Sequence, residues 1–169
     1  MEELYSETFL KAKPPVKWKV IRVLLIILAA FFVAIGLFFS LLMGTMLVFF
    51  VMVILAGIVF YFVPTNKIAY EYIFVDGQID FDRILNGSKR KTMQRIDMEK
   101  MEFCTPENSH RLEQYKQMPL KDYSSGMSGD SHWIAVVLGE KGVERIKFTP
   151  DEKMLHMMKM KYPSKIVEI

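Results

Sequence analysis

The stretch that decides the fold runs from Val23 to Val63 and reads VLLIILAAFFVAIGLFFSLLMGTMLVFFVMVILAGIVFYFV. It contains no charged residue, and its only strongly polar side chains are Ser40 and Thr45. A single helix of this length would extend about 60 Å, twice the thickness of the hydrocarbon core of a bilayer. We therefore expect two antiparallel transmembrane helices over residues 23–63, with the turn near residues 40–45.

The composition of the whole chain hides this division. The 169 residues are 51% hydrophobic and 24% charged, with a net charge of +3, which would also suit a soluble protein. The apolar run excludes a purely soluble monomer, and the single cysteine excludes a secreted disulfide scaffold. The run is also far longer than the apolar region of a cleaved signal peptide. We expect a short segment, residues 1–22, before the membrane hairpin and one domain, residues 64–169, after it.

The orientation follows from the basic residues that flank the apolar run. The turn between the two helices carries no charge, so the positive-inside rule places both ends in the cytoplasm. The sequence therefore predicts a multi-pass protein of the inner (plasma) membrane, with residues 1–22 and 64–169 in the cytosol. The flanking residues are Lys11, Lys13, Lys17, Lys19 and Arg22 before the run, and Lys67, Lys89, Arg90 and Lys91 after it.

Two further features of the apolar run bear on its role. It contains no ionisable side chain, and channels and pumps normally need one within the membrane, so both classes are disfavoured. Ala30 and Ala34 form a small-xxx-small pair, a spacing that permits close contact between helices. A homodimer is possible on this ground, but nothing else in the sequence supports it.

The residues after the apolar run alternate between apolar and polar side chains in short segments, which is typical of antiparallel strands. Asp76-Gly77 suits a two-residue hairpin turn, and Asn86-Gly87-Ser88 provides a second turn. The predicted strands cover residues 68–75, 78–85, 89–97 and 98–104.

The last third of the chain predicts a loop, a hairpin and a helix. Residues 105–131 are polar and read as loop with one edge strand near residues 111–118. A buried strand at 132–138 and a strand at 143–148 flank a turn at 139–142. A helix over about 150–162 begins with Thr149 as the N-cap and Pro150 as the first helical residue.

Two stretches carry a resemblance to a known family. The run YEYIFVDGQIDFDRILNGSKRK, residues 70–91, and the ending IKFTPDEKML, residues 146–155, followed by Tyr162-Pro163, resemble a family of uncharacterised small bacterial membrane proteins. In that family two N-terminal transmembrane helices precede a cytosolic pleckstrin-homology-like (PH-like) domain. The resemblance implies a fold and a location, and it supplies no reaction or catalytic residue. PH domains that bind phosphoinositides use basic residues around the first hairpin loop. We place that loop at Asp76-Gly77, which is short and acidic.

The expected fold is therefore a membrane helical hairpin followed by a mainly β (α+β) PH-like domain. Six or seven short strands would form a small barrel or a strongly bent sheet, and the C-terminal helix would plug its open edge.

The strongest candidate contact site is the basic turn, Lys89-Arg90-Lys91, with Arg83 and Arg95 nearby in sequence. Such a cluster can lie on anionic lipid headgroups, where each basic residue contributes about 1 kcal/mol, or on an acidic partner. The alternative is a solvated hairpin tip that serves only solubility. Nucleic-acid binding is not expected, because the chain after residue 66 has 17 basic and 16 acidic residues.

Catalytic, cofactor and metal sites are not predicted. Asp80 and Asp82 have the DxD spacing of metal-dependent sugar transferases but lack a nucleotide-binding α/β context. The three histidines and Cys104 lack metal-ligand spacing, and no third group would orient a Cys/His nucleophilic pair. The histidines are His110, His132 and His156.

The methionines of the C-terminal helix offer a second contact surface. Four of them lie between residues 154 and 160, and most are expected to plug the barrel. Met160 falls off the inward stripe and is the best candidate for contact with a partner. The sequence thus favours a non-enzymatic membrane protein without cofactors, whose cytosolic domain binds anionic lipid or another membrane protein. The alternative is an accessory subunit of a membrane transport system.

Overall fold

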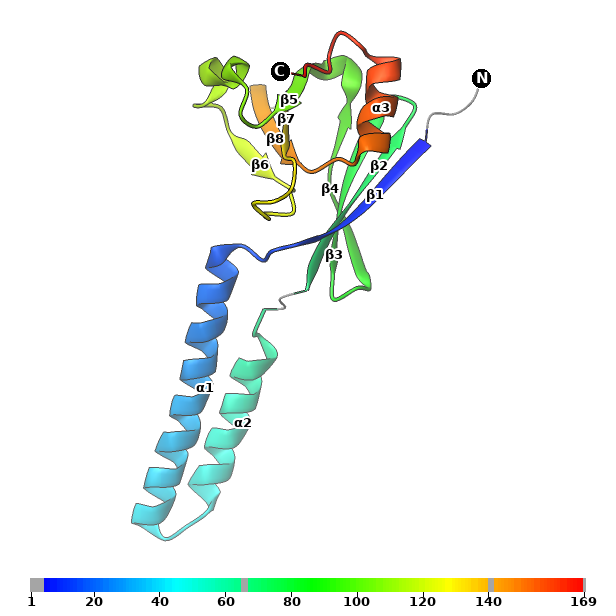
Figure 1. Cartoon of the computed structure of the whole chain (residues 1–169). Coiled ribbons are helices and arrows are strands. Elements are labelled where there is room, and N and C mark those ends of the chain that lie inside the picture. The colour runs from blue at the N-terminus through cyan, green and yellow to red at the C-terminus, as the bar shows by residue number, and fades with distance from the viewer. Residues whose placement is uncertain (1–4, 65–66, 140–141, 169) are drawn as a thin grey trace. The chain divides into compact units, whose positions relative to one another are not determined.

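The computed structural model describes residues 5–64, 67–139 and 142–168 and divides the chain into two compact units (Figure 1). One unit is Pro14–Asn66, and the other joins the chain up to Lys13 with the chain from Lys67 onwards. The apolar segment is therefore an insertion within the sheet-forming unit. The boundaries predicted at residues 22 and 63 place the first strand of this unit, which lies before residue 13, in a different segment from its other strands.

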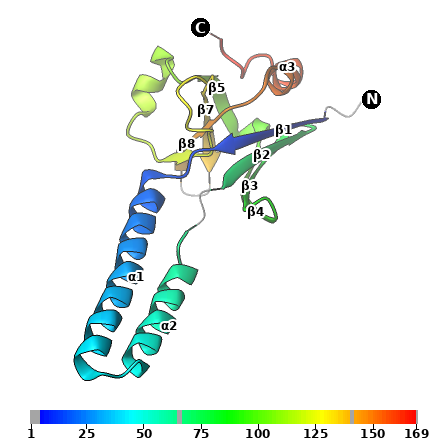
Figure 2. The ribbon, with the colours of Figure 1, turned by 60° about the horizontal axis from the view of Figure 1, so that its bottom comes forward.

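The helical unit consists of α1 (Val16–Met43) and α2 (Leu47–Tyr61), which pack side by side (Figures 1 and 2). Gly44 ends α1 in the left-handed conformation, with φ of 67°. The helices approach closely at Gly36, where a Cβ would lie 2.7 Å from the Cβ of Met52. Ala30 and Ala34, in contrast, are exposed.

The predicted membrane hairpin is only partly supported. α1 begins earlier than residue 23, and Ser40 remains helical, so that the chain turns at residues 44–46. α1 alone is long and apolar enough to cross a membrane, by length and composition. α2 has 15 residues and extends about 22 Å, which is shorter than a hydrocarbon core of about 30 Å. Two crossings are thus not confirmed.

The first sheet, sheet A, is a four-stranded antiparallel meander in the order β1-β2-β3-β4. Its strands β2, β3 and β4 have the predicted bounds, whereas β1 lies in the segment predicted to precede the domain. Asp76 and Gly77 form the β2–β3 turn with φ values of 47° and 98°, as the Asp-Gly dipeptide favours. The strands are β1 (Tyr5–Ala12), β2 (Ile68–Val75), β3 (Gln78–Leu85) and β4 (Lys89–Asp97).

The second sheet, sheet B, has the strand order β5-β7-β8-β6. The edge strand predicted near residues 111–118 is wrong, because a 3-10 helix, η2 (His110–Tyr115), occupies that segment. The hydroxyl of Ser109 caps this helix by accepting a hydrogen bond from Arg111 N. The turn predicted at 139–142 includes residues 140–141, which lie outside the described part of the chain. The strands are β5 (Met101–Pro106), β6 (Leu120–Asp122), β7 (Trp133–Gly139) and β8 (Gly142–Phe148).

The two sheets do not close into a barrel, so this part of the fold prediction is wrong. The chain passes from β4 to β5 through a 3-10 helix, η1 (Met98–Lys100), and the sheets stay separate hydrogen-bonded units. The barrel expectation rested on a continuous series of hairpins. The corner at η1 instead turns the chain into a second sheet, and among the described strands only β3 pairs with β4.

The C-terminal helix α3 (Glu152–Lys161) packs its methionines into the core. Met154 and Met158 are fully buried, while Met160 is 60% exposed, as its position off the stripe predicted. Thr149 is not the N-cap: the carboxylate of Asp151 accepts a hydrogen bond from Met154 N at 2.8 Å. Past the helix end, Tyr162 covers the β2–β3 turn, where a Cβ on Gly77 would lie 2.9 Å from the Tyr162 hydroxyl.

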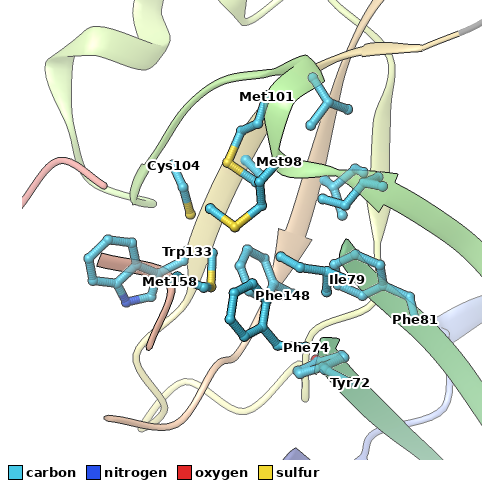
Figure 3. Close-up of a cluster of buried hydrophobic side chains, with 14 of the residues drawn as sticks. Tyr72, Phe74, Ile79, Phe81, Met98, Met101, Cys104, Trp133, Phe148 and Met158 are labelled. Atoms are coloured by element: carbon cyan, nitrogen blue, oxygen red, sulfur yellow. The ribbon is translucent and has the colours of Figure 1, made fainter. Parts of the chain in front are cut away.

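The core lies between the inner faces of the two sheets and α3 (Figure 3). Tyr72, Phe81 and Phe148 pack edge to face with ring centroids 5.3–5.8 Å apart, which links β2 and β3 with β8. The Tyr72 hydroxyl donates to the Tyr123 carbonyl at 2.6 Å. This shared core holds the two sheets together although no ladder joins them.

Candidate functional site

One end of sheet A carries both junctions with the apolar insertion. The antiparallel register places Ala12, Ile68, Leu85 and Lys89 in one row across the four strands. The chain leaves the sheet after Ala12 and returns just before Ile68. The first connection of the sheet is therefore the apolar insertion, and the assignment of the first hairpin loop to Asp76-Gly77 was wrong.

Exposed lysines gather at this same end of the sheet. We call this set the basic end, and each of its side chains belongs to a residue of the last row or within two positions of it. The opposite end carries carboxylates, among which Asp76 pairs with Lys161 and Asp80 with Arg95. Sheet A thus carries exposed lysines at one end and ion-paired carboxylates at the other. The basic end comprises Lys11, Lys13, Lys67, Lys89 and Lys91.

The structure separates the five cations that the sequence grouped together. Lys89 and Lys91 are exposed at the β3–β4 tip and form no ion pair within the described residues. Arg95 is engaged with Asp80, its Nε lying 2.5 Å from Oδ1. Arg83 is half-buried, and its charge acts on Tyr70, whose pKa is raised chiefly by burial. Arg90 belongs to a separate ion-pair cluster.

Arg90 forms ion pairs with two buried carboxylates on the outer face of sheet A. Glu71 and Asp82 face each other across β2 and β3, and their side chains are only 6% and 7% exposed. Arg90 pairs with Glu71, and its Nε lies 3.8 Å from Asp82 Oδ2. Burial raises the pKa of Glu71, Arg90 opposes this shift, and a hydrogen bond with Glu7 adds to it. Arg90 thus forms ion pairs within sheet A, while its own side chain is 53% exposed.

A Ser/His/Asp grouping occurs in the loop before β7, but it lacks the geometry of a nucleophilic triad. His132 is engaged at both ring nitrogens, by Thr149 Oγ1 at 2.9 Å and by the Met127 carbonyl at 2.9 Å. The buried Ser125 hydroxyl donates to Asp130 instead. Because the histidine does not contact the serine, these hydrogen bonds fasten the loop. The Ser125 carbonyl also accepts from Lys13 N at 2.8 Å, at the junction with α1.

The remaining candidates for chemistry are not brought together. Within residues 5–64, 67–139 and 142–168, no group of three His, Cys, Asp or Glu side chains is arranged to hold a metal ion. His110 and His156 are exposed on different elements. Cys104 is fully buried, and burial raises the pKa of its thiol.

A groove that the sequence did not predict lies between the two sheets. Its volume is about 960 Å³, and one wall is formed by residues 94–97 of β4. The other wall comes from sheet B, with Leu138 on β7 and Lys121 on β6, and Lys100 of η1 also lines the groove. Sequence reasoning missed this site because it exists only where the expected barrel fails to close.

Comparison with known protein families gives a match over nearly the whole chain. Residues 2–168 match the family described as Bacterial PH-like domain (DUF6106). A search of curated proteins finds no match, and neither does a search of solved structures. The match thus covers nearly the whole chain, including the apolar insertion.

Proposed function

Because the chain belongs to this family of bacterial PH-like domains, we propose that it is a membrane-anchored binding domain. In this proposal residues 23–63 fold back within the bilayer, and the PH-like unit stays in the cytosol. The basic end of sheet A contacts the anionic headgroups of the inner leaflet.

The observation that carries the proposal is the pairing of Ala12 with Ile68. Residues paired across antiparallel strands lie about 5 Å apart. The segment between them, which contains the charge-free residues 23–63, therefore leaves the sheet and returns to it at one place. A membrane segment with such ends must begin and finish in the same compartment, either as two crossings or as a re-entrant hairpin.

The surface of the helical unit supports insertion into lipid. Only Gly36 of α1 and Ala56 of α2 are buried, while side chains such as Phe38, Ile54 and Phe60 are about two-thirds exposed. An apolar surface of this extent is not stable in water. The charge-free part of α1, residues 23–43, is about 30 Å long, which suits one crossing. Phe62 and Val63 extend the shorter apolar stretch of α2.

The lysines support the orientation and the headgroup contact. Lys13 and Lys67 flank the insertion, and positive charge next to membrane helices favours the cytoplasmic side. Lys89 and Lys91 lie at the same end of the sheet by register. Each lysine near an anionic surface contributes about 1 kcal/mol, so the basic end would hold the domain against the inner leaflet.

Single-cysteine labelling tests the topology in the full chain. The buried Cys104 is replaced with serine, and cysteines are placed at Thr45, between the helices, and at the exposed Ser128. In intact spheroplasts a membrane-impermeant maleimide should label T45C, and it should label S128C only after permeabilisation. Labelling of S128C from outside would refute the orientation. If the T45C thiol were protected from the maleimide on both sides of the membrane, the apolar segment would be a re-entrant hairpin rather than two crossings.

Headgroup contact is tested separately in nanodiscs. An environment-sensitive fluorophore on S88C, at the β3–β4 tip, should report a less polar environment with phosphatidylglycerol than with phosphatidylcholine, most clearly at low salt. Replacing Lys89 and Lys91 with serine should remove this difference. The matched control replaces two exposed lysines outside sheet A, Lys116 and Lys153, and should leave it unchanged. Equal loss with both pairs would refute a specific basic end.

We also propose that the domain binds rather than catalyses. The two engaged nitrogens of His132 and the buried thiol of Cys104 support this. The alternative role, an accessory subunit of a transport system, would show itself as a stable membrane partner with transport activity that copurifies with the full chain from native membranes.

A further inference from the structure

The outer edge of β4 is a long strand edge that makes no ladder within the described residues. β1 is the other edge of sheet A and contacts α3, for example through Thr8 Oγ1 and Met154 Sδ at 3.7 Å. The edge of β5 is bonded by the C-terminal segment, because Cys104 N donates to the Lys165 carbonyl. β6 has only three residues. β4 has nine, and within the described residues its outer edge makes no ladder with any strand.

The groove runs along this unpaired edge. Four consecutive residues of β4, 94–97, line it, although side chains of consecutive strand residues point to opposite faces. The groove therefore borders the main chain of β4 rather than one face of the sheet. On its other side, β7 continues past its pairing with β5 to Leu138, which is 57% exposed.

Polar side chains in the groove form hydrogen bonds and an ion pair with protein groups. The side chain of Gln94 donates to Glu144 of β8 and accepts from the Tyr123 hydroxyl at 3.2 Å. Glu144 also pairs with Lys121 at 2.7 Å. These contacts join the sheets below the opening. Leu138 and Pro119 also line the groove, and the outer edge of β4 makes no ladder within the described residues.

We propose that this groove binds an extended, acidic peptide segment of a partner protein, which adds to β4 as a further strand. Main-chain hydrogen bonds along β4 would supply much of the affinity, as in other cases of strand addition. Alternate side chains of the segment would fall on Leu138 and Pro119, and its carboxylates would meet Lys100.

Charge decides between the possible occupants. In β4, which reads KRKTMQRID, Arg90 and Arg95 pair with carboxylates of sheet A, whereas Lys89 and Lys91 form no ion pair within the described residues. The β4 strand of a second copy would bring the same positive charge to the edge, and like charges on paired strands are destabilising. Lys100 is exposed and has no ion pair within the described residues. Of the two carboxylates that line the groove, Glu144 pairs with Lys121, whereas Asp97 accepts a hydrogen bond from Glu99 N and keeps its negative charge.

This inference deepens the proposed function, since it names a protein ligand for the same membrane-anchored domain. The two can fail independently. Headgroup contact is read at the β3–β4 tip through Lys89 and Lys91, whereas peptide binding is read at residues 94–97 and on sheet B.

The experiment uses the full chain in nanodiscs of neutral lipid, panned against a phage-displayed library of random short peptides. We expect enrichment of peptides that alternate apolar and acidic residues. A synthetic peptide of the enriched sequence should slow amide hydrogen exchange at residues 94–97. The L138D and K100E variants should each weaken its binding about tenfold or more.

Matched controls keep the result specific. Leu120 on β6 is 46% exposed and does not line the groove, so L120D adds the same charge elsewhere and should leave binding unchanged. K116E is the corresponding control for K100E. The proposal is overturned by any of four results: no enrichment, enriched peptides that bind L138D and L120D equally, protection of β1 instead of β4, or a dimer that protects residues 94–97 without peptide.

Discussion

Replacing Arg90 with alanine should destabilise the sheet-forming unit at neutral pH and much less in acid. The substitution removes the cation that faces Glu71 and Asp82, whose side chains are 6% and 7% exposed. Two carboxylates would then lie almost buried and directly opposite each other across β2 and β3. Glu7 shares a hydrogen bond with Glu71, so a third carboxylate adjoins the pair.

The magnitude follows from how deeply this ion-pair cluster is buried. Removing one partner of a fully buried ion pair costs about 3–5 kcal/mol, because the remaining charge stays desolvated. The side chain of Arg90 is itself 53% exposed, so water can reach the vacated space. We therefore expect a loss of about 2 kcal/mol in the free energy of unfolding at about pH 8.

The pH dependence has a definite sign. Burial raises the pKa of Glu71 above its ordinary value, and Arg90 opposes this shift. A group whose pKa is higher in the folded state takes up protons on folding, so the unfolding free energy rises as the pH falls through the folded-state pKa to the unfolded-state pKa. Without Arg90 the pKa of Glu71 rises further. The deficit of the variant should shrink to below about 1 kcal/mol at about pH 5.

The assay is urea denaturation in detergent, followed by the fluorescence of the buried Trp133 with Trp18 replaced by phenylalanine. Arg95→Ala is the matched control, because Arg95 lies on the same strand and its ion pair with Asp80 is more exposed. It should cost clearly less. Adding Glu71→Gln to Arg90→Ala should recover part of the loss. Equal costs for the two arginine variants, or a cost independent of pH, would refute the reasoning.

Three further predictions concern the core and the C-terminal helix. Tyr72→Phe leaves the buried Tyr123 carbonyl without its donor and should lower the unfolding free energy by about 1–2 kcal/mol in the same denaturation assay. Asp151→Ala removes the N-cap of α3, whose carboxylate accepts from Met154 N, and should cost about 1 kcal/mol, with Asp151→Asn retaining most of the stability. Cys104, buried and with a raised thiol pKa, should react with Ellman's reagent only at the rate of unfolding, and fast reaction in the native protein would contradict its burial.

Much of the local structure of this protein could be predicted from its sequence. Strands predicted at 68–75, 78–85 and 89–97 coincide with β2, β3 and β4, because their alternation and their turn residues depend only on neighbours along the chain. The charge-free run likewise marked the apolar helices. The amphipathic stripe of α3 correctly left Met160 exposed.

The tertiary structure alone decided which distant segments pair. β1 escaped prediction because its inward positions include Ser6 and Thr8, which are small and polar, and because the whole apolar insertion separates it from β2. The candidate site changed for the same reason. Arg90 was grouped with the neighbouring lysines along the chain, but its partner Glu71 lies on another strand. Lysines far apart in sequence came together at one end of sheet A, and the groove opened where two sheets failed to join. Pairing and closure depend on contacts between residues remote in sequence, which local patterns do not encode.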